Sequence, residues 1–585
     1  MRLVFDIETN GLLKQASVIH SLVIYNLDTQ ERGSYADRPN YPSIDQGLDV
    51  LQSAHLLIGH NITSFDLPAI FKITKRSFSN PVFDTLLACQ MCFTEDMYKE
   101  GNSLKVWGQR LKIDKLSFKE DNSFDHWSEE MQRYCERDVE INTKLFNYIE
   151  ETKRLSSQAL ELETSFKRLM DKQENYGISF DMEKALALQT KIGGEITIRE
   201  KEIQRIIPFH LKRGKLFTPK KRNSKTGLYP NSSFIKISYE KFNPNSRPQI
   251  LEELRLRYGW ETSDRTEKNA PQLKREVLAS LPFPEAKILS EYLDMNKAFS
   301  MLSEGDTAWL KCVQNSRIHG KVFTLGTVTG RCSHNSPNLA QVPSKRSLYG
   351  NEFRTLFHSP KGWIVGADAS GIELRCFAHY LGAYDEGNYG KAVVTGDVHT
   401  LNMKAAGLPN RDSAKTFIYA FLYGAGQQKL GSILKPEASK EQQASIGAKV
   451  KYMFLRNIAG IEQLVNQVKR IADSRGYLTA IDGRYLYIRS SHLALNTLLQ
   501  SCGAIIMKRA AVIWAQKMEE MDLSNHVFPV LNVHDEIQCE VLREDLIPIV
   551  GQILVDSIKQ AGEFYNLRVP LDGEYKYGKN WAQTH

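Results

Sequence analysis

The sequence predicts a multidomain protein of mixed α/β and α+β class. Its 585 residues exceed what one hydrophobic core usually holds, so we expect roughly three or four folding units. Short apolar strands alternate with helical stretches over residues 1–150, which is an α/β pattern. Two strand-rich stretches further along flank a helical region at about 398–473, and we expect these stretches to pair in one sheet.

The individual elements follow from apolar periodicity and from helix breakers. In the first 150 residues the strands are LVFDIE, SVIHSLVIYN and HLLIGHN. A helix-favouring segment runs from about Leu155 to Ile207 and is broken at Pro208, and helical periodicity resumes over 249–313. KVFTLGT, GWIVGADAS and YLTAIDGRYLYIRS are predicted strands. A helix over 493–520 and a hairpin around His534 complete the expected elements.

Composition narrows the class of protein. An apolar content of 42% with 25% charged residues is typical of globular proteins. No apolar run approaches the roughly 20 residues of a membrane span, and acidic residues interrupt the N-terminal strand where a signal peptide would be apolar. Eight cysteines are too few for a disulfide framework, which indicates a reducing compartment. Cys89 and Cys92 form one C-x-x-C without a second pair, so we expect core packing rather than zinc.

The N-terminal region contains a candidate metal-dependent nuclease site. Asp6 and Glu8 lie two residues apart on a predicted strand, so both side chains leave the same face. Asp66 follows Asn61 by five residues, and the amide could orient the carboxylate. In YCERD a tyrosine and an aspartate lie one helical turn apart. Phosphodiester hydrolysis by two metal ions requires carboxylates in this number. The predicted site consists of Asp6, Glu8, Asp66, Tyr134 and Asp138.

The C-terminal half contains a second set of acids. The apolar run in WIVGADASGIE ends at Asp368, so this carboxylate is expected at a strand end. In VLNVHDEIQCEV two apolar strands flank His534, and a tight hairpin would present Asp535 and Glu536 at its tip. If the two elements are neighbours in one sheet, Asp368 and Asp535 can bracket two Mg²⁺ ions about 4 Å apart, as in-line nucleotidyl transfer requires.

The segment RDSAKTFIYAFLYGAG predicts a helix that could grip a nucleotide. Asn410 is a candidate N-cap. Arg411, Lys415, Tyr419 and Tyr423 recur every four residues, so two cations and two aromatic rings share one helix face. Cations near a helix N-terminus suit a triphosphate, and aromatic rings can stack on a base or sugar. The alternative, a salt-bridged amphipathic helix, would be favoured if this segment stood alone.

A basic tract precedes these sites. Seven cations and no acidic residue lie between His210 and Lys225, among glycine, proline, asparagine and serine. Such a loop is too polar to fold on its own and is typical of an arm for a phosphate backbone. The alternative is a solvated charge run. The candidate phosphate contacts are Lys220, Lys221 and Arg222.

Several motifs resemble known polymerases. DIET, N-x-x-x-F-D and Y-x-x-x-D resemble the three motifs of the proofreading exonuclease of DNA polymerases. DASGIELR, R-x-x-x-K-T-F-I-Y-x-F-L-Y-G-A-G and VHDE resemble motifs A, B and C of family A DNA polymerases. TVTGRCSHNSPNLAQVP, HLALNTLLQS and LDGEYKYGKNWAQTH are similar to the replicative polymerases of podovirus-type bacteriophages, so the resemblance covers essentially the whole chain.

The resemblance implies a ribonuclease-H-like exonuclease domain and a right-hand polymerase domain. The exonuclease takes 1–150, and the thumb takes 151–310 with a short basic insertion at 207–243. The palm takes 311–395 and 476–585, with the fingers at 396–475 between them.

Roles for individual residues follow from the same resemblance. Asp368 and Asp535 would bind both polymerase metal ions, with the Ala369 carbonyl as a further ligand and Glu536 close by. Lys415 would be the general acid to the pyrophosphate. In the exonuclease, the metal ligands would be Asp6, Glu8, Asp66 and Asp138.

Further residues would contact the nucleotide and the DNA. Arg411, Lys415 and His399 would contact the triphosphate. Tyr419 would stack on the incoming nucleotide, while Glu373 would close the space beneath its 2′ carbon and exclude ribonucleotides. The candidate contacts to primer and template are Arg331, Gln341, Asn496, Gln500 and His534.

The implied activity is DNA-templated DNA synthesis with 3′–5′ proofreading. It requires primer-template DNA, deoxynucleoside triphosphates and Mg²⁺, with two ions at each site and Mn²⁺ as a substitute. The resemblance further implies a monomer that works in the cytoplasm of the infected host cell without membrane contact. Whether a phage helicase-primase is a further partner is left open. Some phage members carry a longer thumb insertion that recruits host thioredoxin, and the short stretch at 207–243 disfavours thioredoxin dependence.

Other functions are open on the sequence alone. Bacterial-type repair polymerases often contain a degenerate exonuclease domain, which the intact N-terminal acids disfavour. A non-catalytic nucleic-acid-binding scaffold would be favoured by the loss of Asp368 or Asp535, and both are present. A single-subunit RNA polymerase shares the palm, but Glu373 and the nuclease motifs disfavour it.

Overall fold

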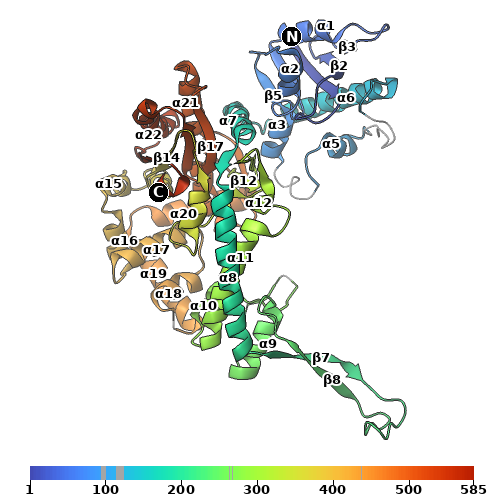
Figure 1. Cartoon of the computed structure of the whole chain (residues 1–585). Coiled ribbons are helices and arrows are strands. Elements are labelled where there is room, and N and C mark those ends of the chain that lie inside the picture. The colour runs from blue at the N-terminus through green and yellow to red at the C-terminus, as the bar shows by residue number, and fades with distance from the viewer. Residues whose placement is uncertain (94–99, 114–123, 263, 267, 437, 585) are drawn as a thin grey trace.

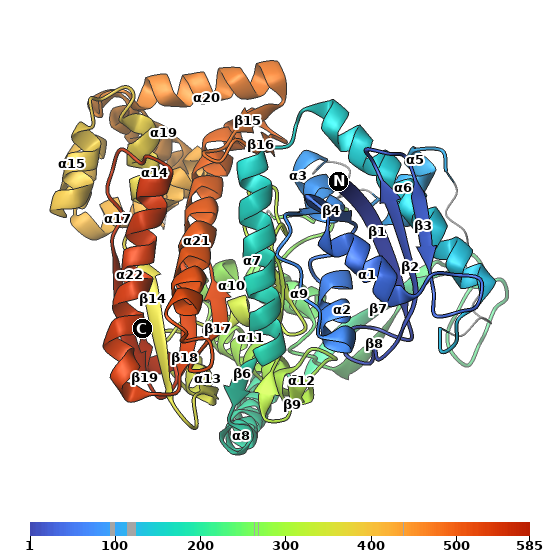
Figure 2. The same ribbon diagram turned by 90° about the horizontal axis from the view of Figure 1, so that it is seen from above.

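The computed structural model describes residues 1–584 except 94–99, 114–123, 263, 267 and 437. Figure 1 shows an N-terminal domain at one end, a large helical and β body beside it, and a thin hairpin that projects from the opposite end. In the view from above, helix α7 (Ser157–Tyr176) lies between the N-terminal domain and the body (Figure 2). The order of elements agrees with the predicted multidomain α/β and α+β class.

The N-terminal domain is built on a five-stranded mixed sheet of order β3-β2-β1-β4-β5. Strand β1 pairs antiparallel with β2 and parallel with β4. Both faces are covered by buried apolar side chains, and Cys89 and Cys92 lie in one of these cores, as predicted. The strands are β1 (Arg2–Thr9), β2 (Ile19–Asn26), β3 (Arg32–Tyr35), β4 (Leu56–Gly59) and β5 (Val82–Asp84). The helices are α1 (Ile44–Gln52), α2 (Asp66–Thr74), α3 (Thr85–Cys92), α5 (Leu104–Arg110) and α6 (Glu129–Thr152).

The helix-favouring segment at 155–207 forms two helices instead of one. Gly177, at φ 69°, ends α7, and the short strand β6 (Ile178–Phe180) follows before α8 (Met182–Ile206) begins. Glycine adopts positive φ without steric cost, which explains a break that periodicity does not show. β6 pairs with β10 (Arg317–Ile318) and β13 (Phe357–His358), so this break ties α7 and α8 to the body.

The loop predicted for the basic tract is wrong for its first half. Residues 210–217 belong to strand β7 (Phe209–Phe217), which forms a projecting antiparallel hairpin with β8 (Phe234–Lys241), while residues 218–225, with Lys220, Lys221 and Arg222, lie in the connection between the two strands. Leu211 pairs with Tyr239 and Leu216 with Ile235, and the backbone groups of the two strands satisfy each other. Four helices follow: α9 (Arg247–Tyr258), α10 (Arg275–Ser280), α11 (Pro284–Ser303) and α12 (Trp309–Cys312).

The predicted pairing of the two C-terminal strand regions is confirmed only for GWIVGADAS and the hairpin around His534, because KVFTLGT and YLTAIDGRYLYIRS belong to separate two-stranded sheets. One four-stranded antiparallel sheet has the order β17-β18-β14-β19. Helix α21 (Ala494–Glu520) and helix α22 (Ile547–Phe564) pack in the core beside this sheet. By length and composition the segment Ser491–Glu520 could cross a membrane, but 78% of its apolar window is buried inside the protein. The strands are β14 (Trp363–Ala369), β17 (Val527–Val533), β18 (Glu536–Val541) and β19 (Gly573–Gly578).

A mainly helical region lies between β14 and α21, as predicted. Its first helix, α14 (Ile372–Leu381), begins three residues after β14 ends. Two other expected strand segments are shorter than predicted. In KVFTLGT only β11 (Lys321–Phe323) forms, paired with β12 (Ser333–Asn335), and YLTAIDGRYLYIRS contains β15 (Tyr477–Thr479) paired with β16 (Tyr485–Tyr487). The remaining helices are α15 (Asn388–Thr395), α16 (Val398–Ala406), α17 (Arg411–Leu422), α18 (Gln427–Leu434), α19 (Lys440–Asn457) and α20 (Ile461–Arg475).

Candidate active sites

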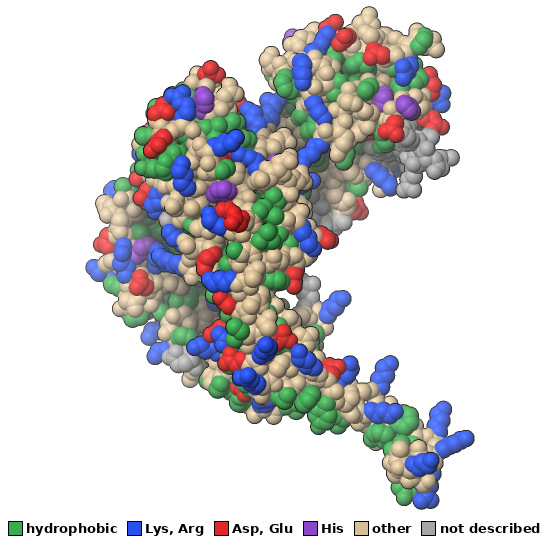
Figure 3. Space-filling model, viewed as in Figure 1, with side chains coloured by type: hydrophobic (Ala, Val, Ile, Leu, Met, Phe, Trp, Pro, Cys, Tyr) green, Lys and Arg blue, Asp and Glu red, His purple; other side chains and the backbone are tan. Residues whose placement is uncertain are grey.

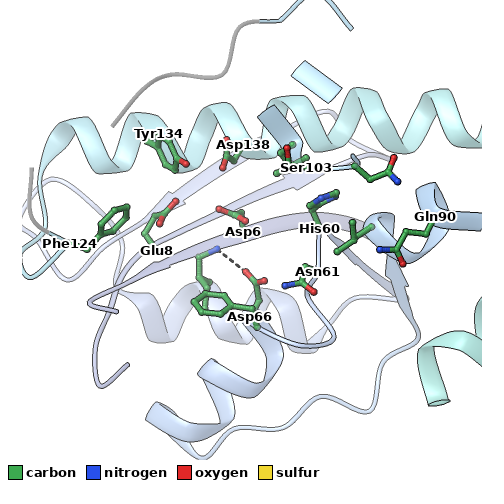
Figure 4. A pocket seen from close by; sticks show the side chains of 15 residues that line it. Asp6, Glu8, His60, Asn61, Asp66, Gln90, Ser103, Phe124, Tyr134 and Asp138 are labelled. Atoms are coloured by element: carbon green, nitrogen blue, oxygen red, sulfur yellow. Dashed lines mark hydrogen bonds between the residues drawn. The ribbon is translucent and has the colours of Figure 1, made fainter. Parts of the chain in front are cut away.

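The structure brings the five predicted nuclease residues to one pocket in the N-terminal domain (Figure 4). Asp6 and Glu8 come from β1, Asp66 starts α2, and Tyr134 and Asp138 come from α6. The two α6 residues lie one turn apart and face the sheet, as the sequence spacing predicts. Four carboxylates therefore converge on one pocket with a volume of about 500 Å³.

Burial makes this pocket electrostatically unfavourable for negative charge alone. Asp66 is 2% exposed, and burial raises the pKa of its carboxyl group to about 7, with a further contribution from the Asp84 carboxylate. The backbone N–H of Ile7 donates to Asp66 Oδ1 at 3.2 Å. Asn61 lines the pocket, but its backbone N–H donates to Asp84 at 2.9 Å. A divalent cation would offset the clustered negative charge, so the donor set fits a metal site.

Sequence reasoning missed Cys135, a fully buried residue beneath the acids. Its Sγ donates to the Asp6 backbone oxygen at 3.3 Å and lies 3.6 Å from Asp6 Oδ2. Asp6, Glu8 and Cys135 each offer one ligand atom within 4.8 Å of the others. A signal was available in the sequence, because Cys135 precedes Asp138 by three residues and so shares its side of the helix.

The second site forms where two strands of the body sheet end together. In the register of β14 and β18, Asp368 pairs with Glu536, and the Ala369 N–H donates to the Asp535 carbonyl at 3.2 Å. His534 and Asp535 form the turn between β17 and β18, with His534 at φ 54°. The Asp368 and Asp535 residues are therefore neighbours at one edge, as the predicted pairing requires.

Charge around Asp535 also favours a cation. Burial raises the pKa of the Asp535 carboxyl group to about 7, and the Glu373 and Asp368 carboxylates raise it further while Arg331 opposes them. Glu536 lies in a different environment. It is 7% exposed, and its Oε1 accepts hydrogen bonds from Trp581 Nε1 at 2.7 Å and from the Gln538 amide.

Two aromatic residues of the predicted nucleotide face lie beside these acids. The Tyr423 hydroxyl donates to Glu373 Oε1 at 2.7 Å, and an Arg331 nitrogen lies 3.9 Å from the same oxygen. Tyr419 is half-buried, and burial raises the pKa of its hydroxyl, with contributions from the Glu373, Asp535 and Asp368 carboxylates. Tyr419 thus lies on the acidic side of the site.

The cations of the same face lie near the start of α17. The predicted N-cap is confirmed, because the Asn410 side chain accepts from the Ser413 N–H at 2.8 Å. Arg411 and Lys415 are exposed. Burial lowers the pKa of His399 on α16, and the nearby Arg411 and Lys415 charges lower it further. Three basic side chains are therefore close together at a helix N-terminus, where anions bind.

The predicted DNA contacts lie in four places. Arg331 and His534 line a small cavity next to Asp535. On α21 the Gln500 amide donates to Asn496 Oδ1 at 3.3 Å, while Asn496 Nδ2 donates to the Leu422 carbonyl at 2.9 Å. Gln341 is exposed at the end of the 3₁₀ turn Leu339–Gln341.

The fourth place is the hairpin of β7 and β8. Lys220, Lys221 and Arg222 are exposed in its connection, and Figure 3 shows basic side chains gathered at the hairpin tip. One strand face also exposes apolar side chains, which sequence reasoning missed: Leu216, Ile235, Ile237 and Tyr239.

Comparisons with known proteins place the chain in a family. The model "DNA polymerase family A" matches residues 226–583, and the model "3'-5' exonuclease" matches residues 2–153. The DNA-directed DNA polymerases of Escherichia phage T7 and Enterobacteria phage T3 are each 31% identical over 722 residues, covering 100% of both chains. DNA polymerase I of Pseudomonas aeruginosa is 29% identical over 60% of this chain and 39% of its own.

A solved structure supports the fold. The POL domain of Pol1 from M. smegmatis, in complex with DNA primer-template and dNTP, superposes with a TM-score of 0.75 at 19% identity, covering 100% of this chain and 96% of that chain. The resemblance predicted from the motifs is confirmed. The chain belongs to DNA polymerase family A and carries a 3′–5′ exonuclease domain at its N-terminus.

Proposed function

We propose that the two carboxylate sites carry out opposite reactions on one DNA end. The site of Asp368 and Asp535 adds deoxynucleotides to a primer, and the site of Asp6 and Glu8 removes them from the 3′ end. The observation that carries the proposal is the placement of Asp368 and Asp535 at adjoining strand ends of one sheet, with Ala369 N–H bonded to the Asp535 carbonyl. This agrees with the family and with the phage relatives, which are named DNA-directed DNA polymerases.

At the polymerase site, Asp368, Asp535 and the Ala369 carbonyl would hold two Mg²⁺ ions. These hard oxygen donors suit Mg²⁺, with Mn²⁺ as a substitute, and ions held there would supply the positive charge needed to activate the primer hydroxyl and to stabilise the leaving oxygen. Glu536 is a weaker candidate for direct ligation, because Trp581 and Gln538 already bond its carboxylate. We assign it the role of holding the hairpin tip in place.

The nucleotide would bind along α17. Arg411, Lys415 and His399 bind the triphosphate, and Lys415 donates a proton to the departing pyrophosphate. Tyr419 stacks on the incoming nucleotide. Glu373, held by the Tyr423 hydroxyl, closes the space beneath the 2′ carbon and excludes ribonucleotides.

At the exonuclease site, two Mg²⁺ ions would be held by Asp6, Glu8, Asp66 and Asp138. Burial raises the pKa of the Asp66 carboxyl group to about 7, and a cation beside it would favour the ionised form. Tyr134 lies beside Glu8 in Figure 4 and would orient the attacking water.

The DNA would run from the palm toward the projecting hairpin. Arg331, His534, Asn496, Gln500 and Gln341 would contact primer and template near the growing end. The basic side chains at the hairpin tip would contact phosphates further away. The domain limits follow as proposed: exonuclease 1–150, thumb 151–310 with insertion 207–243, palm 311–395 and 476–585, and fingers 396–475.

The setting is also proposed. The phage relatives favour replication in the cytoplasm of an infected host cell. A monomeric state, a helicase-primase partner and independence from thioredoxin stay predictions. The bacterial repair alternative is disfavoured because the phage relatives, unlike the bacterial one, match the chain over its full length.

Single-primed circular DNA tests this function. In EDTA we expect neither primer extension nor 3′ degradation, and Mg²⁺ should restore extension with nucleotides present and degradation without them. Adding a trap for rebinding measures product length per binding event. Extension in EDTA would contradict the metal assignment. Failure of both reactions in Mg²⁺ would favour the alternative of a non-catalytic nucleic-acid-binding scaffold.

A further inference from the structure

A short segment of the body connects the two domains that carry the active sites. Strands β11 and β12 are joined by residues 324–332, which we call the bridging loop. Val322, in β11, packs in the core of the body, whereas Leu325, three residues later, is 8% exposed and packs in a core of the N-terminal domain. Ala159 and Leu160, at the start of α7, belong to that same core. The bridging loop therefore has its first apolar anchor in the exonuclease domain.

The other end of the bridging loop reaches the polymerase site. Arg331 lines a small cavity together with Asp535, and one of its side-chain nitrogens lies 3.9 Å from Glu373 Oε1. The loop before it is compact, because the Gly330 N–H donates to the Thr327 carbonyl at 3.0 Å and the Thr327 hydroxyl donates to the Arg331 carbonyl at 3.2 Å. The position of the Arg331 backbone therefore depends on the residues of the loop that precede it.

Lys508 of α21 holds the start of the bridging loop. It is 3% exposed, and its ammonium group donates to the Thr324 carbonyl at 2.7 Å and to the two Glu163 carboxylate oxygens at 2.7 and 2.9 Å. A lysine ammonium group has three N–H donors, so all three are used inside the protein. Glu163 is fully buried on α7, the helix between the N-terminal domain and the body (Figure 2). Lys508 therefore joins the bridging loop to that helix.

A second buried cation supports the end of the bridging loop. Arg484 is 4% exposed, and its guanidinium group donates to Glu163 at 2.7 Å and to Asp482 at 2.8 Å. The two cations and the two carboxylates of this network balance in charge, as buried ions require. Gly330, at φ 75°, lies against the guanidinium group, and a Cβ there would be 3.1 Å from Arg484 Nη1. The last turn of the bridging loop therefore packs on the buried network.

We propose that Leu325 and Lys508 are positioning residues that place Arg331 for its contact with the primer end. This inference rests on the proposed DNA contact of Arg331. Lys508 acts through the backbone of the bridging loop, since its three donors bond Glu163 and Thr324. The exonuclease domain thus supports primer binding at the polymerase site through its apolar core, without using its carboxylates. The two reactions stay separable, whereas primer binding depends on both domains.

Primer extension by the full-length enzyme separates this role from a general loosening of the fold. Lys508→Met should raise the KM for primer-template about five-fold or more, the lower end of the effect of losing one side-chain contact to DNA. The KM for deoxynucleoside triphosphates should change by less than about two-fold, because the proposed triphosphate contacts lie on α16 and α17 and the bridging loop is held by α7 and α21. Lys508→Arg, which keeps the charge, should restore most of the wild-type KM for primer-template.

The matched control is Arg509→Met. Arg509 is the next residue of α21, is also buried, and pairs with Glu161 of α7 at 2.8 Å. Its replacement removes a neighbouring ion pair between the same two helices and should leave both KM values unchanged.

Leu325→Ala tests the other anchor without leaving a buried charge unpaired. It should raise the KM for primer-template in the same way, whereas Leu160→Ala, which truncates a leucine of the same core, should not. A double-mutant cycle shows whether the effect passes through Arg331. Adding Leu325→Ala or Lys508→Met to Arg331→Ala should raise this KM no further, because the contact is already lost.

Three results would overturn the inference: an unchanged KM for primer-template in Leu325→Ala or in folded Lys508→Met, an equal rise in Leu160→Ala or Arg509→Met, or full additivity with Arg331→Ala. If Lys508→Met does not fold, the comparison of Leu325→Ala with Leu160→Ala decides. The proposed function is tested separately. Wild-type enzyme that does not extend primers contradicts that function, whereas normal extension by the wild type and by both anchor variants contradicts only the positioning role.

Discussion

Replacing Asp535 by asparagine should stabilise the metal-free polymerase site while abolishing DNA synthesis. Asn is close to Asp in size and carries no charge. Burial and the Glu373 and Asp368 carboxylates raise the pKa of the Asp535 carboxyl group from 3.8 to about 7 in the folded protein. An ionised Asp535 is therefore unfavourable without a cation.

The sign and size of the effect follow from linkage. The folded state binds the Asp535 proton more tightly than the unfolded state, so stability falls as pH rises from about 4 to about 7 and is constant above. A shift of about three units corresponds to at most about 4 kcal/mol at pH 8 and about 2 kcal/mol at pH 5. Asp535→Asn removes this pH-dependent cost.

Hydrogen exchange measured by mass spectrometry tests this at the site. In EDTA at pH 8, the β14 and β18 amides of Asp535→Asn should be better protected than those of the wild type, and the gain should shrink at pH 5. Wild type and variant are compared at one pH, so intrinsic exchange rates cancel. The exposed Asp522 supplies the control, since Asp522→Asn should change protection at neither pH. Equal protection of wild type and Asp535→Asn at pH 8, or a gain that grows at low pH, would refute the reasoning.

Three further predictions concern the nucleotide and the DNA. Tyr419→Phe should leave normal extension nearly intact but raise discrimination against dideoxynucleotides roughly ten-fold or more. The reason is that the tyrosine hydroxyl can replace the missing 3′-hydroxyl in a hydrogen bond of about 1–3 kcal/mol. If the ratio of deoxynucleotide to dideoxynucleotide incorporation efficiency is the same in both enzymes, Tyr419 does not face the sugar. Replacing Lys220, Lys221 and Arg222 by glutamine should shorten the products made per binding event. It should also reduce the slope of log DNA affinity against log salt concentration by roughly one unit per lost contact. An unchanged slope would show that these side chains are a solvated charge run without phosphate contacts. Thioredoxin added to the wild type should change product length little, and a large gain would show that the 207–243 segment recruits it.

Features set by local sequence were predictable. The turn at His534, the Asn410 cap and the strand ending near Asp368 depend on residues close to each other in the chain. The pairing of β14 with β18 was also predictable, because both are apolar strands with an acidic residue at one end. The sequence therefore located both carboxylate sites.

Features set by distant contacts were not predictable. Cys135 meets Asp6 across 129 positions of the chain, and Trp581 reaches Glu536 across 45. The hairpin of β7 and β8 was missed because its cations dominate the composition, while the strands depend on pairing between Leu216 inside the basic tract and Ile235 beyond it. Gly177 is a local signal for the end of α7, but the short strand β6 that follows it depends on pairing with β10, more than a hundred residues later.

The central claim is that the two carboxylate sites are separate in structure and in reaction. The most direct test measures 3′ degradation and primer extension side by side in two variants. Asp6→Ala/Glu8→Ala should lose degradation of single-stranded DNA and keep extension of a matched primer, while Asp368→Asn should lose extension and keep degradation. Degradation by the double variant, or normal extension by Asp368→Asn, would contradict the account.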